Sequence, residues 1–325
     1  MSSPVSIQLC NLVSNPRLVT SQRGCLILAN TVHGSQGFGR SSTYDSLRNS
    51  SCTSCQLSVD KSAYYFPLLY YRSQDGHSFS SIRQNGGALI YYLFRRDTPD
   101  IPLVAFPKGF QMVTGNIFDR SQQNTSEAHA TMWTCINYES GSEGVPAIPS
   151  THCPENLRMQ IEFPSCWDGV NVDSPDHKSH GNSVRVLLLM VVAYPSSIDN
   201  GVCPSAFPVR LPTLYVEIEW IIHDFADQWY DNASHPFVLS TGDPTGYGSH
   251  GAFQNGWDVN ILQQALNTCD NGTSIDECPI LQNYTQPSSV QASCSLCISP
   301  SLSGTDLSKS VSGAGFGHSR PNAWM

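Results

Sequence analysis

Charged side chains are scarce in this sequence. Aspartate, glutamate, lysine and arginine make up only 13% of the 325 residues, about half of the roughly 25% that is usual in soluble proteins. The net charge is -9 at pH 7, and the isoelectric point is near 5.5. A partner held through its phosphates requires an excess of lysine and arginine, so we expect no nucleic-acid partner.

Long apolar runs are also missing. The longest, VLLLMVVA over residues 186–193, is far shorter than the ~20 residues that a membrane-spanning helix needs, so we expect no membrane span. The first residues, MSSPVSIQLCNLVSNPRLVTSQ, lack the basic flank and apolar core of a signal peptide. The sequence contains no P-loop and no nucleophile elbow of the GxSxG type, so it gives no support to nucleotide hydrolysis or to α/β-hydrolase chemistry.

Cysteines, in contrast, are numerous. The chain has 12, an even number that allows six disulfides, whose pairing the sequence does not give. The pairs Cys52/Cys55 and Cys294/Cys297 have the C-x-x-C spacing of a zinc ribbon or a redox motif, but they lie near opposite ends of the chain. We therefore expect disulfides, with each close pair bridged outward rather than to itself.

Glycosylation acceptors agree with export. The motif Asn-x-Ser/Thr occurs at Asn49, Asn124, Asn232, Asn271 and Asn283. Together with the cysteines, these sequons favour an extracellular, secreted glycoprotein. We interpret the missing signal peptide as the result of a misassigned first exon, so that the true start of the protein is absent from this sequence.

Short apolar segments rich in β-branched and aromatic residues dominate the rest of the chain. Residues 157–163 (LRMQIEF) and 214–222 (LYVEIEWII) alternate polar and apolar positions, which is the period of a half-buried strand. One helix is expected over residues 258–268, with Asp258 as its cap. We predict a mainly β protein: a single disulfide-braced β-sandwich or jelly-roll-like domain with long loops and a little helix. Further strands are expected at residues 64–71, 88–94, 132–138 and 236–240.

Five long blocks occur in an order that resembles a known family. They are CTSCQLSVDKSAYYFPLLYY, AFPKGFQMVTG, FPSCWDGVNVDSPDHKSH, GVCPSAFPVRLPTLYVEIEW and STGDPTGYGSHGAFQNGWD. Together they resemble the DUF1996 family, which is mostly fungal, secreted and without an established reaction. The resemblance implies export and disulfides but no activity. It divides the chain into a poorly patterned segment (1–30), a DUF1996-like domain (31–298) and a Ser/Gly-rich tail (299–325) that we expect to be disordered.

The chain departs from the family pattern at three places. The family's His-x-His pair would fall at Leu28 and Asn30, and the aspartate of its HGDF motif is Ala252 here. Residues 181–192 intervene before the AYP segment that normally follows the DHKSH block, and we interpret them as a retained intron. If the family uses the pair and the carboxylate in catalysis, this copy is inactive.

The densest group of candidate catalytic residues lies in FPSCWDGVNVDSPDHKSHGNS. Two histidines three residues apart lie on one face of a helical turn, where a neighbouring aspartate can orient either ring. Such a group is suited to binding a divalent metal ion or to acid–base chemistry. The alternative is a surface turn whose carboxylates cap backbone amides, pinned by a disulfide at Cys166 beside Trp167. The candidates are Asp168, Asp173, Asp176, His177 and His180.

Two further blocks are candidates for binding. In Gly242–His250, Asp243 offers a base and His250 an imidazole, while glycines let the backbone approach a ligand closely. Tyr247 and Trp257 are candidates to stack against a sugar, and Trp167, from the preceding block, is a further candidate for ligand binding. The alternative is a glycine-rich turn with a hydrogen-bonded histidine. The third block is Asp60, Lys61 and Tyr64, which could bind a polar ligand or simply lead into a strand.

Two functions of different classes remain open. The first is a secreted, glycan-active hydrolase in which two of the aspartates form an acid/base pair, and a histidine tunes them or holds a divalent metal ion. The second is a non-catalytic protein that binds cell-wall glycan or another polysaccharide. The two differ in whether the polar side chains converge in one open cleft or are occupied as backbone caps.

Overall fold

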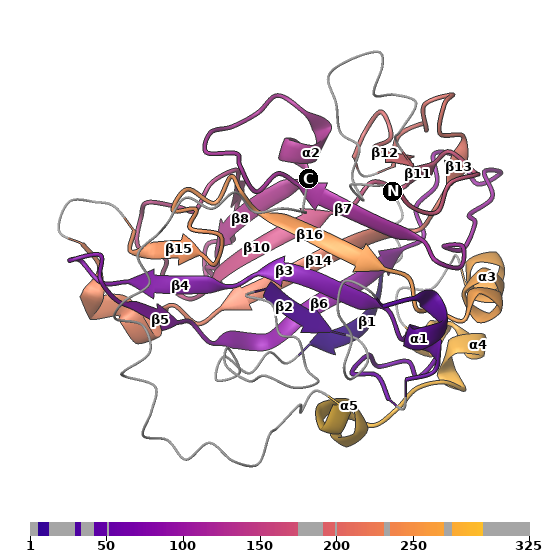
Figure 1. Ribbon diagram of the computed structural model, residues 1–325, viewed down its shortest axis with the longest axis horizontal. Helices are drawn as coiled ribbons and strands as arrows, with labels where there is room; N and C mark the ends of the chain where they lie inside the picture. Colours follow the sequence, from indigo (N-terminus) through magenta and orange to yellow (C-terminus); the bar gives the residue numbers. More distant parts are fainter. Residues whose placement is uncertain are drawn as a thin grey trace.

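The computed structural model describes residues 6–12, 30–33, 42–50, 52–174, 191–198, 200–230, 235–269 and 275–294. Within them the protein is mainly β, as predicted, and its strands pair antiparallel in several sheets. Figure 1 shows the four-stranded sheet lying in front of the six-stranded one, so that the domain has two main layers. The jelly-roll arrangement itself stays a prediction.

The six-stranded sheet has the order β1-β6-β14-β10-β8-β9. Its strands are β1 (Ser6–Leu12), β6 (Gln84–Leu93), β14 (Thr213–Trp220), β10 (Leu157–Glu162), β8 (Thr131–Cys135) and β9 (Gly144–Val145). The four-stranded sheet has the order β2-β3-β16-β7. Its strands are β2 (Asn30–His33), β3 (Ala63–Pro67), β16 (His250–Gln254) and β7 (Gln111–Gly115).

Two small sheets complete the β structure of the residues that the structure describes. One has the order β15-β4-β5 and consists of β15 (Phe237–Leu239), β4 (Leu69–Arg72) and β5 (Phe79–Ser81). The other has the order β12-β11-β13 and consists of β12 (Val192–Ala193), β11 (Cys166–Trp167) and β13 (Val209–Arg210). Val191 and Val192, the last residues of the segment that we interpreted as a retained intron, are buried, and Val192 pairs with Trp167.

Alternation along β14 creates the core. Val216, Ile218 and Trp220 are fully buried, whereas Tyr215 and Glu217 point to the other face of the sheet. From the four-stranded sheet, Tyr64, Phe66 and Phe253 are buried against this inner face. Burial of apolar area of this extent is the main stabilising contribution to such a fold.

Helices are few and mostly short. The predicted helix is α3 (Val259–Thr268), and Asp258 caps it by accepting hydrogen bonds from the amides of Asn260 and Ile261 at 3.1 and 3.3 Å. Among the described residues, no helix is long and apolar enough to cross a membrane. The other helices are α1 (Tyr44–Arg48), α2 (Ser126–His129), η1 (His223–Gln228), η2 (Ile275–Glu277), α4 (Pro279–Gln282) and α5 (Ser288–Cys294).

Disulfides brace the loops around this core, as expected from the cysteine count. The described bridges are Cys135–Cys153, Cys166–Cys203 and Cys269–Cys278. Cys52 and Cys55 are disulfide-bonded as well, which rules out thiolate ligation of zinc by this C-x-x-C pair. No free thiol occurs among the cysteine side chains that the structure describes.

Candidate functional site

The loop after β11 uses its first aspartate to hold its own backbone. Asp168 Oδ1 accepts hydrogen bonds from the amides of Val170 and Asn171 at 2.8 and 2.9 Å, and Oδ2 accepts one from the Asn171 side chain at 2.6 Å. The Trp167 indole donates to the Asn171 carbonyl at 2.6 Å, and only 9% of this residue is exposed. Asp168 and Trp167 therefore brace a turn that the Cys166–Cys203 disulfide holds in place.

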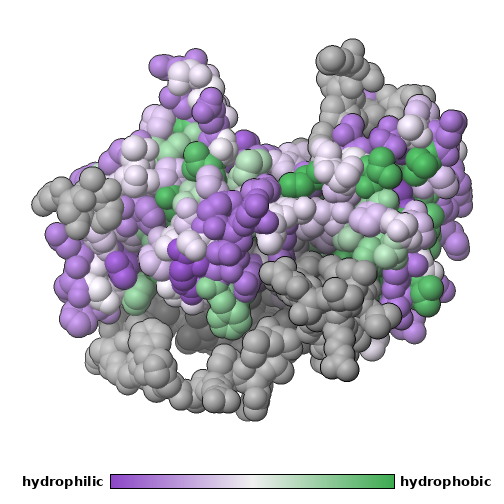
Figure 2. Space-filling view, turned by 90° about the horizontal axis from the view of Figure 1, so that it is seen from above, coloured by the Kyte–Doolittle hydropathy of each residue, from purple (hydrophilic) through white to green (hydrophobic). Residues whose placement is uncertain are grey.

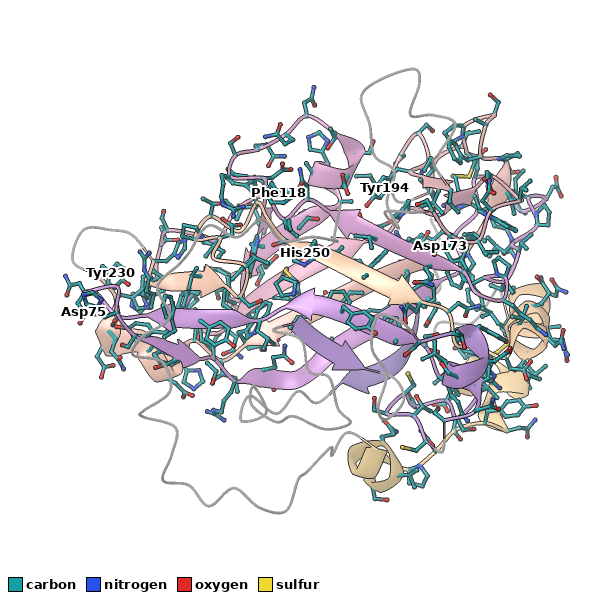
Figure 3. The ribbon with its side chains drawn as sticks, viewed as in Figure 1. Asp75, Phe118, Asp173, Tyr194, Tyr230 and His250 are labelled. Carbon is teal, nitrogen blue, oxygen red and sulfur yellow. A yellow bond between two sulfur atoms is a disulfide. The ribbon has the colours of Figure 1, made fainter. Side chains whose placement is uncertain are left out.

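The remaining members of this block give less information. Asp173 Oδ1 accepts a hydrogen bond from the amide of Ser174 at 2.8 Å, while Asp176, His177 and His180 lie outside the described residues. Within the described part of the chain, no group of three His, Cys, Asp or Glu side chains could hold a metal ion. Figure 3 shows Asp173 well apart from His250, so these two candidates do not share a site.

Asp60 and Tyr64 belong to a polar network inside the core. Asp60 is fully buried and accepts hydrogen bonds from the hydroxyls of Tyr64 and Tyr92 at 3.2 and 3.1 Å. These two hydroxyls also bond to each other, which links β3 to β6. Burial raises the pKa of Asp60 and of both tyrosines. Neither side chain reaches solvent in this structure, so the polar ligand suggested for this block has no access to Asp60 or Tyr64 here.

Lys61 and Trp257 also serve the scaffold. Lys61 Nζ donates to the carbonyls of Arg48 and Ser50 at 3.1 and 2.6 Å, at the C-terminal end of α1 where a cation is favoured. Trp257 is fully buried and meets Tyr92 edge-on at 5.4 Å between ring centroids. In this structure its ring has no solvent-facing side on which a sugar could stack.

The face of the four-stranded sheet that carries Ala252 is apolar at this point. Ala252 packs in a small cluster with Leu47, Ala63 and Tyr65, so an aspartate here would place a carboxylate among apolar side chains. The strand register puts position 30 on the same face, because Asn30 pairs with Pro67 and Ala252 with Tyr65. One position of the missing histidine pair and Ala252 thus fall on the same sheet face.

Asp243 organises the loop before β16. Its side chain is fully buried, and Oδ1 accepts hydrogen bonds from the amide and the hydroxyl of Thr245 at 2.8 and 2.6 Å. Oδ2 accepts a hydrogen bond from the amide of Gly248 at 2.7 Å. Across this loop, Arg120 Nε lies 3.5 Å from Asp243 Oδ1. The carboxylate is thus committed to positioning two loops.

Glycine is required where this loop meets the core. Gly246 has a φ of +85°, and a Cβ there would lie 2.6 Å from Trp133 Nε1 and 2.8 Å from the amide nitrogen of Ile148. The Trp133 indole donates to the Gly246 carbonyl at 3.1 Å. His250 follows the loop, and its Nδ1 lies 3.0 Å from the Gly248 carbonyl, to which it must donate. Tyr247 is held at the surface between these anchors.

The facing loop, residues 116–123, is shaped by a turn. The Asn116 side chain accepts from the amide of Phe118 at 3.2 Å and donates to Asp119 Oδ1 at 2.7 Å, as is usual for asparagine in turns. Arg120 Nη1 closes the turn by donating to the carbonyls of Ile117 and Asp119, both at 2.7 Å. Phe118 is left 58% exposed, and Figure 3 shows it in the upper part of the view, near His250.

These two loops, together with α2, line a shallow depression that is open to solvent. The pairing of β7 with β16, in which Gly115 lies opposite His250, brings the loops together. Tyr247 is half-buried in the wall, and the charged lining residues, Asp119 and Glu127, are both acidic. The neutral polar lining residues are Asn116, Ser121, Gln122, Gln123, Thr131 and Ser249.

Figure 2 looks onto the upper side of the molecule, where the loop 116–123 and α2 lie in Figure 1. The visible surface is mainly hydrophilic, and apolar residues form small scattered groups on it. A face of this character is suited to a hydrophilic partner rather than to a large apolar one.

Sequence reasoning identified Tyr247 but missed the other wall of the depression. The signal was weak, because the segment from Asn116 to Asn124 has the composition of any polar loop. Glu162 was also missed. Burial raises its pKa to about 7, against the opposing effect of Arg95, whose Nη1 lies 3.8 Å from Oε1. Its only sequence signal was a polar position in the alternating strand β10.

Comparison with known proteins identifies the family of this chain. A domain of unknown function, DUF1996, matches residues 27–257. No curated protein and no solved structure matches the chain. The matched region contains strands β2 to β16 and all residues that line the depression. Because the match covers well over half of its length, the chain belongs to the DUF1996 family.

Proposed function

We propose that this protein is a secreted polysaccharide-binding protein and that the depression beside Tyr247 holds the glycan. The observation that carries the proposal is a depression lined by a half-buried tyrosine and by amide and hydroxyl groups. An exposed phenylalanine, Phe118, lies outside this lining on the adjoining turn. Sugars present apolar faces to aromatic rings and hydroxyls to such polar groups. Disulfides in all the described cysteine side chains support an oxidising, extracellular location.

The charges narrow the class of glycan. Asp119 and Glu127 line the depression, and the chain as a whole has a net charge of -9. A polysaccharide that carries carboxylate or sulfate groups would be repelled from this site. The ligand that we propose is therefore a neutral cell-wall glycan, whose binding requires no metal ion.

Binding is favoured over hydrolysis by the state of the aspartates. Asp168 and Asp243, two of the predicted acid/base residues, each accept three hydrogen bonds from their own loops. A general acid or base must instead reach the proton that it transfers. The hydrolase remains the second candidate through Asp176, His177 and His180, which lie outside the described residues.

The test is isothermal titration calorimetry with soluble oligosaccharides of glucose, mannose and N-acetylglucosamine. We expect at least one to bind, and we expect Tyr247→Ala to weaken its affinity at least tenfold. Phe79→Ala is the matched control, since Phe79 is also exposed but lies on β5 in another sheet. Equal affinities of Tyr247→Ala and the wild type would remove the depression from the proposal, and release of reducing sugar during the titration would favour the hydrolase.

A further inference from the structure

One sequon lies directly at the edge of the depression. Asn124, Thr125 and Ser126 are all exposed, which an enzyme that modifies the asparagine requires. On one side of Asn124, Gln123 lines the depression, and on the other side Glu127 does so from the first turn of α2. A group attached to Asn124 therefore starts at the rim of the depression.

We propose that Asn124 carries an N-linked glycan and that this glycan covers the depression, so that the protein's own sugar competes with its ligand. The competition rests on the proposed function, whereas the modification and the covering do not. In the transfer, Asn124 Nδ2 loses a proton and bonds to the anomeric carbon of an oligosaccharide donor. The bond from that carbon to a lipid-linked diphosphate breaks, and the diphosphate leaves.

The local structure favours modification here. Thr125 caps α2 by accepting a hydrogen bond from the amide of Ala128 at 3.2 Å, which places Asn124 just outside the helix. The hydroxyl that the acceptor motif needs belongs to Ser126, the first helical residue, and not to the capping threonine. The requirements of the sequon and of the cap are thus met by different side chains.

The chemistry of the depression matches the inner sugars of such a glycan. These sugars carry hydroxyl and acetamide groups without charge, and Gln122, Gln123 and Ser249 offer hydrogen-bonding partners for both. Tyr247 offers a ring for an apolar sugar face. A tethered sugar is present at a high effective concentration, so it competes with a free ligand even when its contacts are weak.

The experiment compares the wild type with Ser126→Ala, both secreted from a glycosylating eukaryotic host. Ser126→Ala removes the sequon while leaving Asn124 and the capping Thr125 in place. Peptide mass spectrometry measures occupancy at Asn124, and we expect it to be high in the wild type and zero in the variant. Nitration by tetranitromethane then measures access to Tyr247, which we expect to rise at least threefold in Ser126→Ala. Tyr230 is the control, because Figure 3 shows it at the left-hand end of the molecule, apart from Phe118.

The outcomes separate the two proposals. An unmodified Asn124 in the wild type, or equal nitration of Tyr247 in both proteins, overturns the inference. If Tyr247 is protected and the oligosaccharide found by calorimetry binds Ser126→Ala at least tenfold more tightly, the competition is confirmed. If Tyr247 is protected but neither protein binds any oligosaccharide, the glycan cover stands and the proposed function fails.

Discussion

Replacing Asp243 by alanine should destabilise the protein far more than replacing Asp168, although the two carboxylates make the same number of hydrogen bonds. Asp243 is fully buried and accepts hydrogen bonds from two donors of Thr245 and from the amide of Gly248. Asp168 accepts three hydrogen bonds from Val170 and Asn171 at a partly exposed turn. Burial is the main difference between them.

The expected loss in free energy of unfolding follows from the hydrogen-bond donors that each substitution leaves unpaired. In Asp243→Ala the amides of Thr245 and Gly248 lose their acceptor, and a buried unpaired donor costs about 1–3 kcal/mol. Two such groups give a loss of about 2–6 kcal/mol, while the freed Thr245 hydroxyl can rotate to a new partner. The ion pair with Arg120 adds little, because the Arg120 side chain is 43% exposed. In Asp168→Ala water replaces the carboxylate, and the expected loss is about 1 kcal/mol.

Urea denaturation of the two variants, with m and the midpoint fitted separately, measures the comparison. Asp243→Asn is an informative third variant, since it keeps one acceptor and should lose less than Asp243→Ala. If Asp243→Ala and Asp168→Ala lose the same free energy of unfolding, the role of Asp243 as a buried loop anchor is refuted. A stable Asp243→Ala protein that has lost a hydrolytic activity would instead restore its predicted catalytic role.

Three further predictions concern stability. Gly242 and Gly246 both have positive φ, +83° and +85°, but a Cβ at Gly246 would strike the backbone of Ile148, whereas nothing lies within 4 Å of one at Gly242. Gly242→Ala should therefore cost about 1–2 kcal/mol of stability, and Gly246→Ala clearly more. Equal losses in calorimetric unfolding would contradict this. Replacing both cysteines of Cys166–Cys203 by serine should cost about 4 kcal/mol of stability, and replacing those of Cys269–Cys278 about 3 kcal/mol, because the bridges close loops of 37 and 9 residues. A larger loss for Cys269–Cys278 in urea denaturation would be evidence against this account. Burial raises the pKa of Glu162 from 4.5 to about 7, so its contribution to stability is complete below pH ~4.5 and is lost as the pH rises through 7. The free energy of unfolding of Glu162→Gln, measured relative to the wild type, should therefore rise by about 3 kcal/mol between pH 4 and pH 8. If the difference between the two proteins does not depend on pH, the pKa shift of Glu162 is excluded.

The elements that sequence reasoning predicted well are those with a strong local signal. The alternation in LYVEIEW appears as β14 with its polar residues on one face, and Asp258 caps α3 as expected. β16 was missed, because HGAFQ continues a glycine-rich block and reads as a turn. Its Gly251 is needed there since a Cβ would lie 2.7 Å from Phe66 and 2.8 Å from Phe163. Packing of this kind is set by residues distant in sequence.

The candidate site shows the same limit. Asp168 and Asp243 look alike in sequence whether they act as catalysts or as caps, and only the positions of the neighbouring amides distinguish the two roles. The depression joins residues 116–123 to Tyr247 through the register of β7 and β16, which a single sequence does not reveal. Tyr247 could be named in advance because an aromatic residue among glycines is unusual, whereas the polar loop opposite it could not.

The most direct test of the central proposal is to locate a bound oligosaccharide by crystallography of the deglycosylated protein. The proposal predicts a neutral sugar in the depression, with one ring against Tyr247 and hydroxyls within hydrogen-bonding distance of the Gln122 or Gln123 side chains. An oligosaccharide that binds in calorimetry but occupies only another surface would contradict it.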